Sequence, residues 1–382
     1  MMSAQDSWPE PITRVQAISE SGSSVIPDRY VKPPSERPNT STTSSTELLG
    51  LSIDTETSSN VDASDLNIPL IDFQGLLDDD EDNHLVLPDT ILDQVCMASK
   101  NWGFFQIVNH GVSPELMDQV RDVWRQFFHL PFEQKQVYAN TPATYEGYGS
   151  RLGVEKGAIL DWNDYFYLHY LPQSLQDPNK WPALPLSCRE VIAEYCKQLV
   201  KLSKKIMKIL SITLGLEEDY LQNAFEGGEE FGACMRVNFY PKCPQPDLAL
   251  GLSSHSDPGG MTLLLPDDDV VGLQVRKDDT WITVKSAPNS FIVNIGDQIQ
   301  VLTNAIYKSV EHRVTVNSMN ERLSLAFFYN PRGDLIIQPA KELVTLERPA
   351  LYSPMTFNEY RRFIRTMGTR GKLQLESMKS PR

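Results

Sequence analysis

The sequence has few cysteines and no long apolar run. Its five cysteines are odd in number and show no C-x-x-C spacing, which argues against a zinc knuckle or a dithiol redox pair and predicts reduced thiols. No apolar stretch approaches the ~20 residues that cross a bilayer, and no apolar segment follows a basic start at the N-terminus. We therefore expect a soluble protein of the cytoplasm, and also of the nucleus, that does not bind membranes.

Basic residues are also scarce, because 35 lysines and arginines face 50 acidic residues and the net charge is -15. Binding to nucleic acids depends on clusters of basic side chains that neutralise phosphates. The acidic excess therefore argues against a nucleic-acid partner. It also repels small anions at long range, so an anionic substrate would have to be captured by particular arginines.

The composition changes along the 382 residues. The N-terminal tail, residues 1–66, is expected to be partly docked, and residues 39–67 form a flexible Ser/Thr-rich link because they have too little apolar surface to offset the cost of ordering. The apolar residues of the tail that can dock on the main domain are Trp8, Ile12, Val15, Ile18 and Val25. The rest divides into a mixed helical region at 67–225, a β-rich core at 226–340, and a C-terminal helix with a tail at 341–382.

The apolar pattern predicts helices in the first part and short strands in the second. Apolar residues at helical spacing run from Cys188 to Leu214, which predicts a long helix that covers a sheet. After Gly232 the runs become short and β-rich and are broken by Gly, Pro, Asn and Asp, which is typical of sandwiches and barrels. We infer an α+β fold with a mostly β core, a double-stranded β-helix (jelly roll) flanked by helices. The other expected elements are strands at 68–73 and 103–108 and helices at 89–100, 114–128 and 356–366.

His255-Ser256-Asp257 and the distant His312 are candidates for a metal site. Every second side chain of a strand points the same way, so His255 and Asp257 can bind one ion from one face. With His312, two imidazoles and one carboxylate leave three positions of an octahedral ion free, which is the facial triad of non-haem Fe(II) oxygenases. An isolated H-x-D is more often a buried histidine beside a turn aspartate, and zinc can use similar ligands.

Arg322 and Ser324, which follow shortly after His312, share one face of a predicted strand. An arginine fork beside a hydroxyl suits the far carboxylate of a dicarboxylic acid, so this pair points to 2-oxoglutarate. Zinc hydrolysis would leave the pair unexplained, which makes iron the better assignment.

Several motifs occur in a fixed order. They are Asn101-Trp102-Gly103-Phe104-Phe105, Asn109-His110-Gly111, Asn238-Phe239-Tyr240-Pro241-Lys242-Cys243-Pro244, the triad, and Arg322-Leu323-Ser324. In these motifs, over about residues 68–365, the chain resembles the plant 2-oxoglutarate and Fe(II)-dependent dioxygenases. Trp8-Pro9-Glu10-Pro11, Tyr145-Glu146-Gly147-Tyr148-Gly149-Ser150-Arg151 and Met355-Thr356-Phe357 make it most similar to the jasmonate-induced oxygenases, which hydroxylate jasmonic acid to 12-hydroxyjasmonic acid.

The resemblance implies an oxidoreductase that lowers the level of active jasmonate hormone and so damps plant defence signalling. It implies Fe(II), 2-oxoglutarate as co-substrate, O2, ascorbate as reductant, and jasmonic acid as the small-molecule partner. The family pattern assigns Asn238 and Tyr240 to 2-oxoglutarate, beside Arg322 and Ser324. No catalytic side chain is expected beyond the metal ligands, and we expect a monomer.

Arginines are the candidates for holding a substrate carboxylate. Arg236 shares a strand face with Asn238 and Tyr240, and a guanidinium in a dry cavity costs several kcal/mol unless an anion meets it. Either a substrate carboxylate or an internal ion pair would meet this need. Arg361 and Arg365 lie one turn apart on a predicted helix, which taken alone favours a solvated basic helix end. The resemblance implies instead that this helix closes the pocket and that its arginines hold the carboxylate.

Phe328, Phe357 and Tyr167 are the candidates for an aromatic pocket wall, although each could equally pack in the core. Phe328 shares a strand face with Ser324, which places its ring beyond the 2-oxoglutarate pair. Tyr167 departs from the pattern of the jasmonate-induced oxygenases that the chain resembles, in which phenylalanine is usual, so its role is the least defined of the three.

Two other functions are compatible with the motifs. A flavonoid or gibberellin-type oxidase would use the same metal and co-substrate residues. A non-catalytic small-molecule binding module could keep the fold, but the complete triad with its arginine-serine pair disfavours that alternative.

Overall fold

The computed structural model describes residues 10–38, 66–76, 87–153, 155–228, 230–368 and 371–379, apart from the side chains at positions 365 and 367. Within these residues, the fold is built on a large sheet of eight strands in the order β1-β2-β10-β7-β12-β5-β4-β3 and a smaller sheet of four in the order β6-β11-β8-β9. Strands β1 and β2 pair in parallel, whereas the other pairings are antiparallel. The two sheets confirm the predicted α+β fold with a mostly β core.

The strands are mostly short. They are β1 (Leu70–Asp72), β2 (Phe104–Val108), β3 (Gly147–Gly149), β4 (Asp164–Leu171), β5 (Gly232–Tyr240), β6 (Leu252–His255), β7 (Met261–Leu265), β8 (Leu273–Lys277), β9 (Thr280–Thr283), β10 (Phe291–Ile295), β11 (His312–Val314), β12 (Arg322–Asn330), β13 (Ile336–Ile337) and β14 (Met355–Thr356). The α-helices are α1 (Val15–Glu20), α2 (Asp89–Asn101), α3 (Pro114–Phe128), α4 (Phe132–Gln136), α5 (Cys188–Ile212), α6 (Tyr220–Glu226), α7 (Asp297–Leu302), α8 (Phe357–Met367) and α9 (Leu373–Ser377).

Local sequence signals explain where the main helices begin. The Ser113 hydroxyl accepts the N–H of Leu116 at the start of α3, and Pro114 occupies the first turn, where its missing N–H is harmless. Helix α8 begins with a capping box, because the Thr356 hydroxyl accepts the N–H of Glu359 and the Glu359 carboxylate accepts the N–H of Thr356. These signals place both helices within a residue of their predicted bounds.

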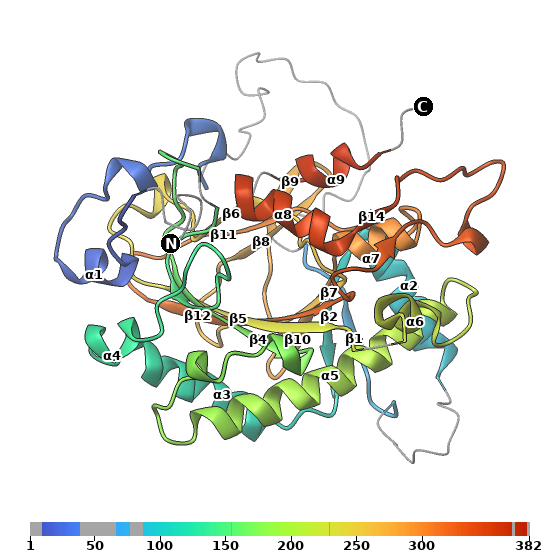
Figure 1. The fold of residues 1–382 in the computed structure, drawn as a ribbon, viewed down its shortest axis with the longest axis horizontal. Helices are drawn as coiled ribbons and strands as arrows, with labels where there is room; N and C mark the ends of the chain where they lie inside the picture. The colour runs from blue at the N-terminus through green and yellow to red at the C-terminus, as the bar shows by residue number, and fades with distance from the viewer. Residues whose placement is uncertain are drawn as a thin grey trace, which may run out of the picture.

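The layers explain why one face of the large sheet carries the site. Helices α3 and α5 cover the lower face in Figure 1, and the small sheet lies above the opposite face. The lower layer is a continuous apolar core in which Trp124, Phe127 and Ile206 are fully buried. Helix α8, red in Figure 1, is drawn on the same side of the large sheet as the small sheet. Polar residues therefore collect between the two sheets and under α8, where the cavity described below is found.

The N-terminal segment 10–38, which we call the N-terminal strap, lies on the main body. Val15 is fully buried and Ile12 and Ile18 are partly buried against the same cluster, whereas Val25 is exposed, contrary to the expectation that it could dock. Trp8 and most of the predicted link lie outside the described residues. All five cysteines are free thiols, as expected. Among the described residues, no helix has the length and apolar character that a membrane span requires.

Candidate metal and 2-oxoglutarate site

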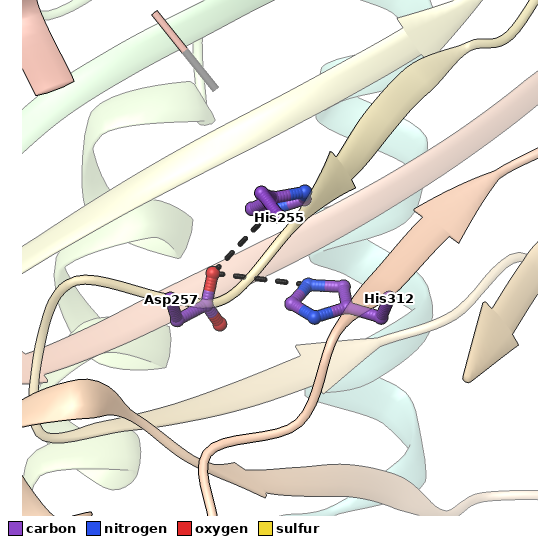
Figure 2. A group of neighbouring side chains, drawn as sticks. All are labelled: His255, Asp257 and His312. Carbon is purple, nitrogen blue, oxygen red and sulfur yellow. Dashed lines mark ion pairs between the residues drawn. The ribbon is translucent and has the colours of Figure 1, made fainter. Parts of the chain in front are cut away.

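The structure brings His255, Asp257 and His312 together at the edge of the small sheet where β6 ends and β11 begins. His255 is the last residue of β6, His312 is the first of β11, and the two are register partners. Asp257 Oδ1 lies 3.6 Å from His255 Nε2 and 3.8 Å from His312 Nε2 (Figure 2). One donor atom from each residue lies within 4.8 Å of the others, the spacing expected around a single ion.

One premise of the sequence argument was wrong. Asp257 does not continue the strand of His255, because β6 ends at His255 and Asp257 lies in the loop that follows. A backbone hydrogen bond anchors this loop, because the N–H of Asp297 at the start of α7 donates to the backbone oxygen of Asp257 at 2.8 Å. The anchored loop holds the carboxylate beside the histidines. The loop conformation, rather than the alternation of side chains along a strand, therefore places Asp257 beside His255.

Two buried polar side chains orient the Asp257 carboxylate. Its Oδ2 accepts the Thr262 hydroxyl at 2.5 Å and the Asn294 amide at 2.8 Å, which leaves Oδ1 to face both imidazoles. Burial alone would raise the pKa of Asp257, but the two histidines and these hydrogen bonds together hold it below its usual value. The carboxylate is therefore ionised and presents one free oxygen, as a metal ligand must.

Both imidazoles present the same nitrogen. His255 Nδ1 lies 2.8 Å from the backbone oxygen of Ser253, and His312 Nδ1 lies 3.3 Å from that of Val310. A proton on Nδ1 satisfies these carbonyls and leaves the Nε2 lone pair free to bind an ion, which is the usual arrangement of metal-binding histidines. Burial, with the neighbouring His312, lowers the pKa of His255 to about 4, so its ring is neutral near neutral pH.

Asn294→Leu is expected to weaken Fe(II) binding by about 10-fold, because loss of an outer-shell partner commonly costs that much in metal affinity. The variant removes one of the two donors that hold Asp257 Oδ2 and preserves the side-chain volume. Anaerobic titration with Fe(II) measures the effect. Asn179→Leu, at an exposed position, serves as the control, and equal affinities for the two variants would contradict the role given to Asn294.

The predicted 2-oxoglutarate residues face one another across β5 and β12. Arg322 is the register partner of Tyr240, and Ser324 is the partner of Asn238. Arg322 Nη1 donates to the Ser324 hydroxyl at 3.3 Å, and its Nε donates to the Val270 carbonyl at 3.1 Å. All four predicted side chains are buried.

This group of residues requires an anion. Among the described residues, no carboxylate forms an ion pair with the buried Arg322, and a buried guanidinium without one is strongly disfavoured. Asn238 Oδ1 is also buried, and within the described ranges it has no hydrogen-bond partner. Burial raises the pKa of Tyr240 against the opposing effect of Arg322, so its hydroxyl stays protonated and can donate.

The triad and this group line one cavity of about 210 Å³. Arg236, Phe328, Phe357, Tyr167 and Arg361, all predicted from the sequence as substrate-binding residues, line it as well. Arg365 belongs to α8, but its side chain lies outside the described part of the structure. The roles of these residues stay predictions, whereas their common location is observed.

Arg236 and Arg361 approach the cavity from different elements. Arg236 lies on β5 with its guanidinium carbon 4.2 Å from the centre of the Tyr165 ring. Arg361 reaches in from α8, where its Nη2 donates to the Tyr167 hydroxyl at 3.5 Å, and Tyr167 is the register partner of Arg236. The tyrosine that departs from the family pattern therefore contacts one arginine and neighbours the other.

Helix α8 is tied to the metal side of the cavity. The Tyr360 hydroxyl donates to Asp297 Oδ2 at 2.6 Å, and the Ser256 hydroxyl donates to the same oxygen at 3.2 Å. Beyond the helix, the N–H of Gly371 donates to the Ser254 carbonyl at 3.0 Å. Hydrogen bonds thus link α8 and the segment after it to the loop and the strand that carry the predicted metal ligands.

The sequence interpretation missed Thr262, Asn294 and Asp297. A signal existed for Asn294, because an asparagine in the apolar run Phe291–Ile295 needs a buried hydrogen-bond partner. Its partner could not be named without the register, which pairs Asn294 with Thr262 across β10 and β7 beside the loop of Asp257.

Comparison with known proteins agrees with this geometry. Residues 231–331 match the 2OG-Fe(II) oxygenase superfamily, and residues 68–184 match the N-terminal region described as non-haem dioxygenase in morphine synthesis. The chain belongs to the 2OG-Fe(II) oxygenase superfamily, as predicted. It is an Fe(II)- and 2-oxoglutarate-dependent dioxygenase, which makes it an oxidoreductase.

Its similar relatives lie within one group. The chain is 60% identical to Jasmonate-induced oxygenase 3 of Arabidopsis thaliana, over 98% of both chains, and 59% identical to Jasmonate-induced oxygenase 2, over 99% of this chain and 96% of the other. The crystal structure of JOX2 in complex with 2OG, Fe and JA matches with a TM-score of 0.86 at 59% identity, over 98% of this chain and all of that one. These matches confirm the predicted resemblance to the jasmonate-induced oxygenases.

The residues present fit the cofactor that this superfamily uses. The donor set is two imidazoles and one ionised carboxylate, whose donor atoms lie close together while the opposite atoms of His255 and Asp257 are already hydrogen-bonded. A nitrogen and oxygen set with open positions suits Fe(II). The buried Arg322, without an ion pair among the described residues, suits the far carboxylate of 2-oxoglutarate.

Proposed function

We propose that this enzyme hydroxylates jasmonic acid to 12-hydroxyjasmonic acid. The observation that carries the proposal is Arg236, which is buried in the cavity beside the triad. Its Nε has no hydrogen-bond partner, and no acidic side chain among the described residues forms an ion pair with it. Of the two alternatives left by the sequence, an internal ion pair lacks support, and a substrate carboxylate fits.

The rest of the cavity suits a small, mostly apolar acid. Phe328 and Phe357 line it and supply apolar surface, and Arg361 adds a second positive charge beside the Tyr167 hydroxyl. Jasmonic acid combines one carboxylate with a cyclopentanone and an apolar chain. The JOX2 structure, which holds JA, supports this assignment through its 59% identity over nearly the whole chain.

In this proposal the side chains position the reactants. When bound, Fe(II) with 2-oxoglutarate and O2 supplies the oxidising chemistry, in which 2-oxoglutarate becomes succinate and carbon dioxide and one oxygen atom enters the substrate. His255, Asp257 and His312 would hold the metal, and Arg322, Ser324, Tyr240 and Asn238 would hold 2-oxoglutarate. Arg236 and Arg361 would fix the substrate carboxylate, so that the carbon to be oxidised faces the metal.

The physiological role follows from this reaction. Hydroxylation would lower the level of active jasmonate hormone and so damp defence signalling. We infer that the enzyme works as a monomer in the cytoplasm and the nucleus, with ascorbate as reductant and without nucleic-acid or membrane partners. The division into a tail, a mixed region, a jelly-roll core and a C-terminal closing helix belongs to the same proposal.

Product analysis tests the assignment directly. Purified protein is incubated with Fe(II), ascorbate, 2-oxoglutarate and jasmonic acid in air, and succinate is measured alongside mass spectrometry of the product. We expect succinate and a product heavier by one oxygen atom in equal amounts, with the hydroxyl on carbon 12. A flavonoid or a gibberellin that supports faster coupled turnover than jasmonic acid would replace the proposal with the corresponding rival function.

A further inference from the structure

The N-terminal strap is an integral part of the folded body. Val15, Ile26 and Tyr30 are at most 2% exposed, and they share a buried cluster with Leu160 and Trp162 of the main domain. The Tyr30 ring meets the Trp162 ring edge-on at 5.3 Å. Figure 1 shows the strap, in blue, along one end of the sheets. In addition to these apolar contacts, the strap contributes a buried charged side chain.

Lys32 is a buried charged residue of the strap. Its side chain is 2% exposed, and its Nζ donates to Asp161 Oδ1 at 2.8 Å and to the Ser253 hydroxyl at 2.9 Å. The Ser253 hydroxyl donates in turn to the same Asp161 oxygen at 2.6 Å. The three groups form a closed triangle that fixes Ser253 from the side of the strap.

Ser253 is also the residue that orients His255. Its backbone oxygen lies 2.8 Å from His255 Nδ1, the contact that directs Nε2 toward the metal position. Ser253 therefore contacts both the Lys32 ammonium group and the His255 imidazole. Ionic and hydrogen-bonded groups behind metal-binding histidines control their ring orientation and the metal affinity.

A second contact of the strap reaches the other imidazole. Arg313 follows His312 directly, and its guanidinium donates to the backbone oxygens of Glu36 and Pro38 at 3.3 and 3.2 Å. The guanidinium carbon lies 4.3 Å from the centre of the Trp281 ring, so its position is fixed. The strap therefore bridges β6 and β11, at positions two residues before His255 and one residue after His312.

We propose that Lys32 is a positioning residue for the metal site, acting on His255 through Ser253. The strap then has a function beyond adding stability, because it holds the ends of the two strands at the separation that the metal requires. This inference depends on the metal site and is independent of the substrate, so metal binding can be measured without jasmonic acid.

Lys32→Met tests the proposal, because it keeps the apolar stem and removes the ammonium group. We expect Mn(II), used as an air-stable probe of the Fe(II) site, to bind about 3- to 10-fold more weakly by calorimetric titration of the full-length protein with 2-oxoglutarate present. The loss should be smaller than for a direct partner of a ligand, which costs about 10- to 100-fold.

Two further variants separate positioning from general stability. Ser253→Ala leaves the Lys32–Asp161 ion pair intact but breaks the link to β6, so it should weaken Mn(II) binding in the same range as Lys32→Met. Arg29→Met removes a different ion pair of the strap, with Glu10 at 2.6 Å, and should lower the melting temperature without changing Mn(II) affinity. Wild-type Mn(II) affinity in both Lys32→Met and Ser253→Ala would overturn the proposal, whatever happens to their melting temperatures.

Discussion

Asp257→Ala is expected to reduce the rate of 2-oxoglutarate consumption by at least about 100-fold, because the loss of a ligand should cost more than the ~10- to 100-fold typical of an outer-shell partner. Asp257 supplies the negative charge of the ligand set, and its Oδ1 is the atom that faces both imidazoles. Without it, only the two imidazoles remain, 4.2 Å apart between ring centres, which is a weak site for Fe(II). Succinate release and the iron content after anaerobic loading measure the two effects.

The same substitution leaves the Thr262 hydroxyl and the Asn294 amide without their acceptor, at a cost of about 1–3 kcal/mol each in stability. Asp257→Asn separates this effect from metal binding, since its amide oxygen still accepts both hydrogen bonds while the charge is gone. It should therefore fold better than Asp257→Ala and remain almost inactive. Asp269→Ala, at an exposed position, is the control for purification and assay. An Asp257→Ala enzyme that still coupled 2-oxoglutarate consumption to product would remove the triad from the mechanism.

Much of the site could be predicted because its residues are close in sequence or lie on regular strands. Arg322 and Ser324 are two residues apart on β12 and both line the cavity. Arg236, Asn238 and Tyr240 follow one another at the same spacing on β5 and line it as well. A period of two residues is sufficient to place such sets on one face. The long helix α5 and the capped helices were predictable for the same reason, since their signals are local.

Other features depended on register and loop shape, which local patterns do not contain. The pairing of His255 with His312 joins strands 57 residues apart, and the approach of Asp257 depends on an anchored loop. The supporting Asn294 and Thr262 became neighbours only through the register of β10 with β7. Lys32 and Ser253 are 221 residues apart in the sequence. Neither their hydrogen bond nor its connection to His255 could therefore be inferred from spacing.

Arg236→Ala is the second prediction with a large effect, and it decides the substrate. We expect it to weaken the binding of jasmonic acid by at least about 30-fold, which corresponds to ~2 kcal/mol, the lower range for truncating one partner of a buried charge pair. The physical reason is that Arg236 has no carboxylate partner among the described residues, so the substrate would supply it. Calorimetry with Mn(II) and 2-oxoglutarate in the absence of turnover measures this affinity.

The methyl ester of jasmonic acid allows a double-mutant-type cycle, in which the affinities of the acid and the ester are compared in the wild type and in Arg236→Ala. The ester lacks the carboxylate charge, so the wild-type protein should bind it much more weakly than the acid. Arg236→Ala should no longer discriminate strongly between the two ligands, because the pair that the charge makes with Arg236 is already gone. The affinity for 2-oxoglutarate should stay unchanged, since Arg322 and Ser324 are intact. If the variant and the wild type preferred the acid over the ester to the same degree, the carboxylate would bind elsewhere, and Arg361 of α8 would be the next candidate.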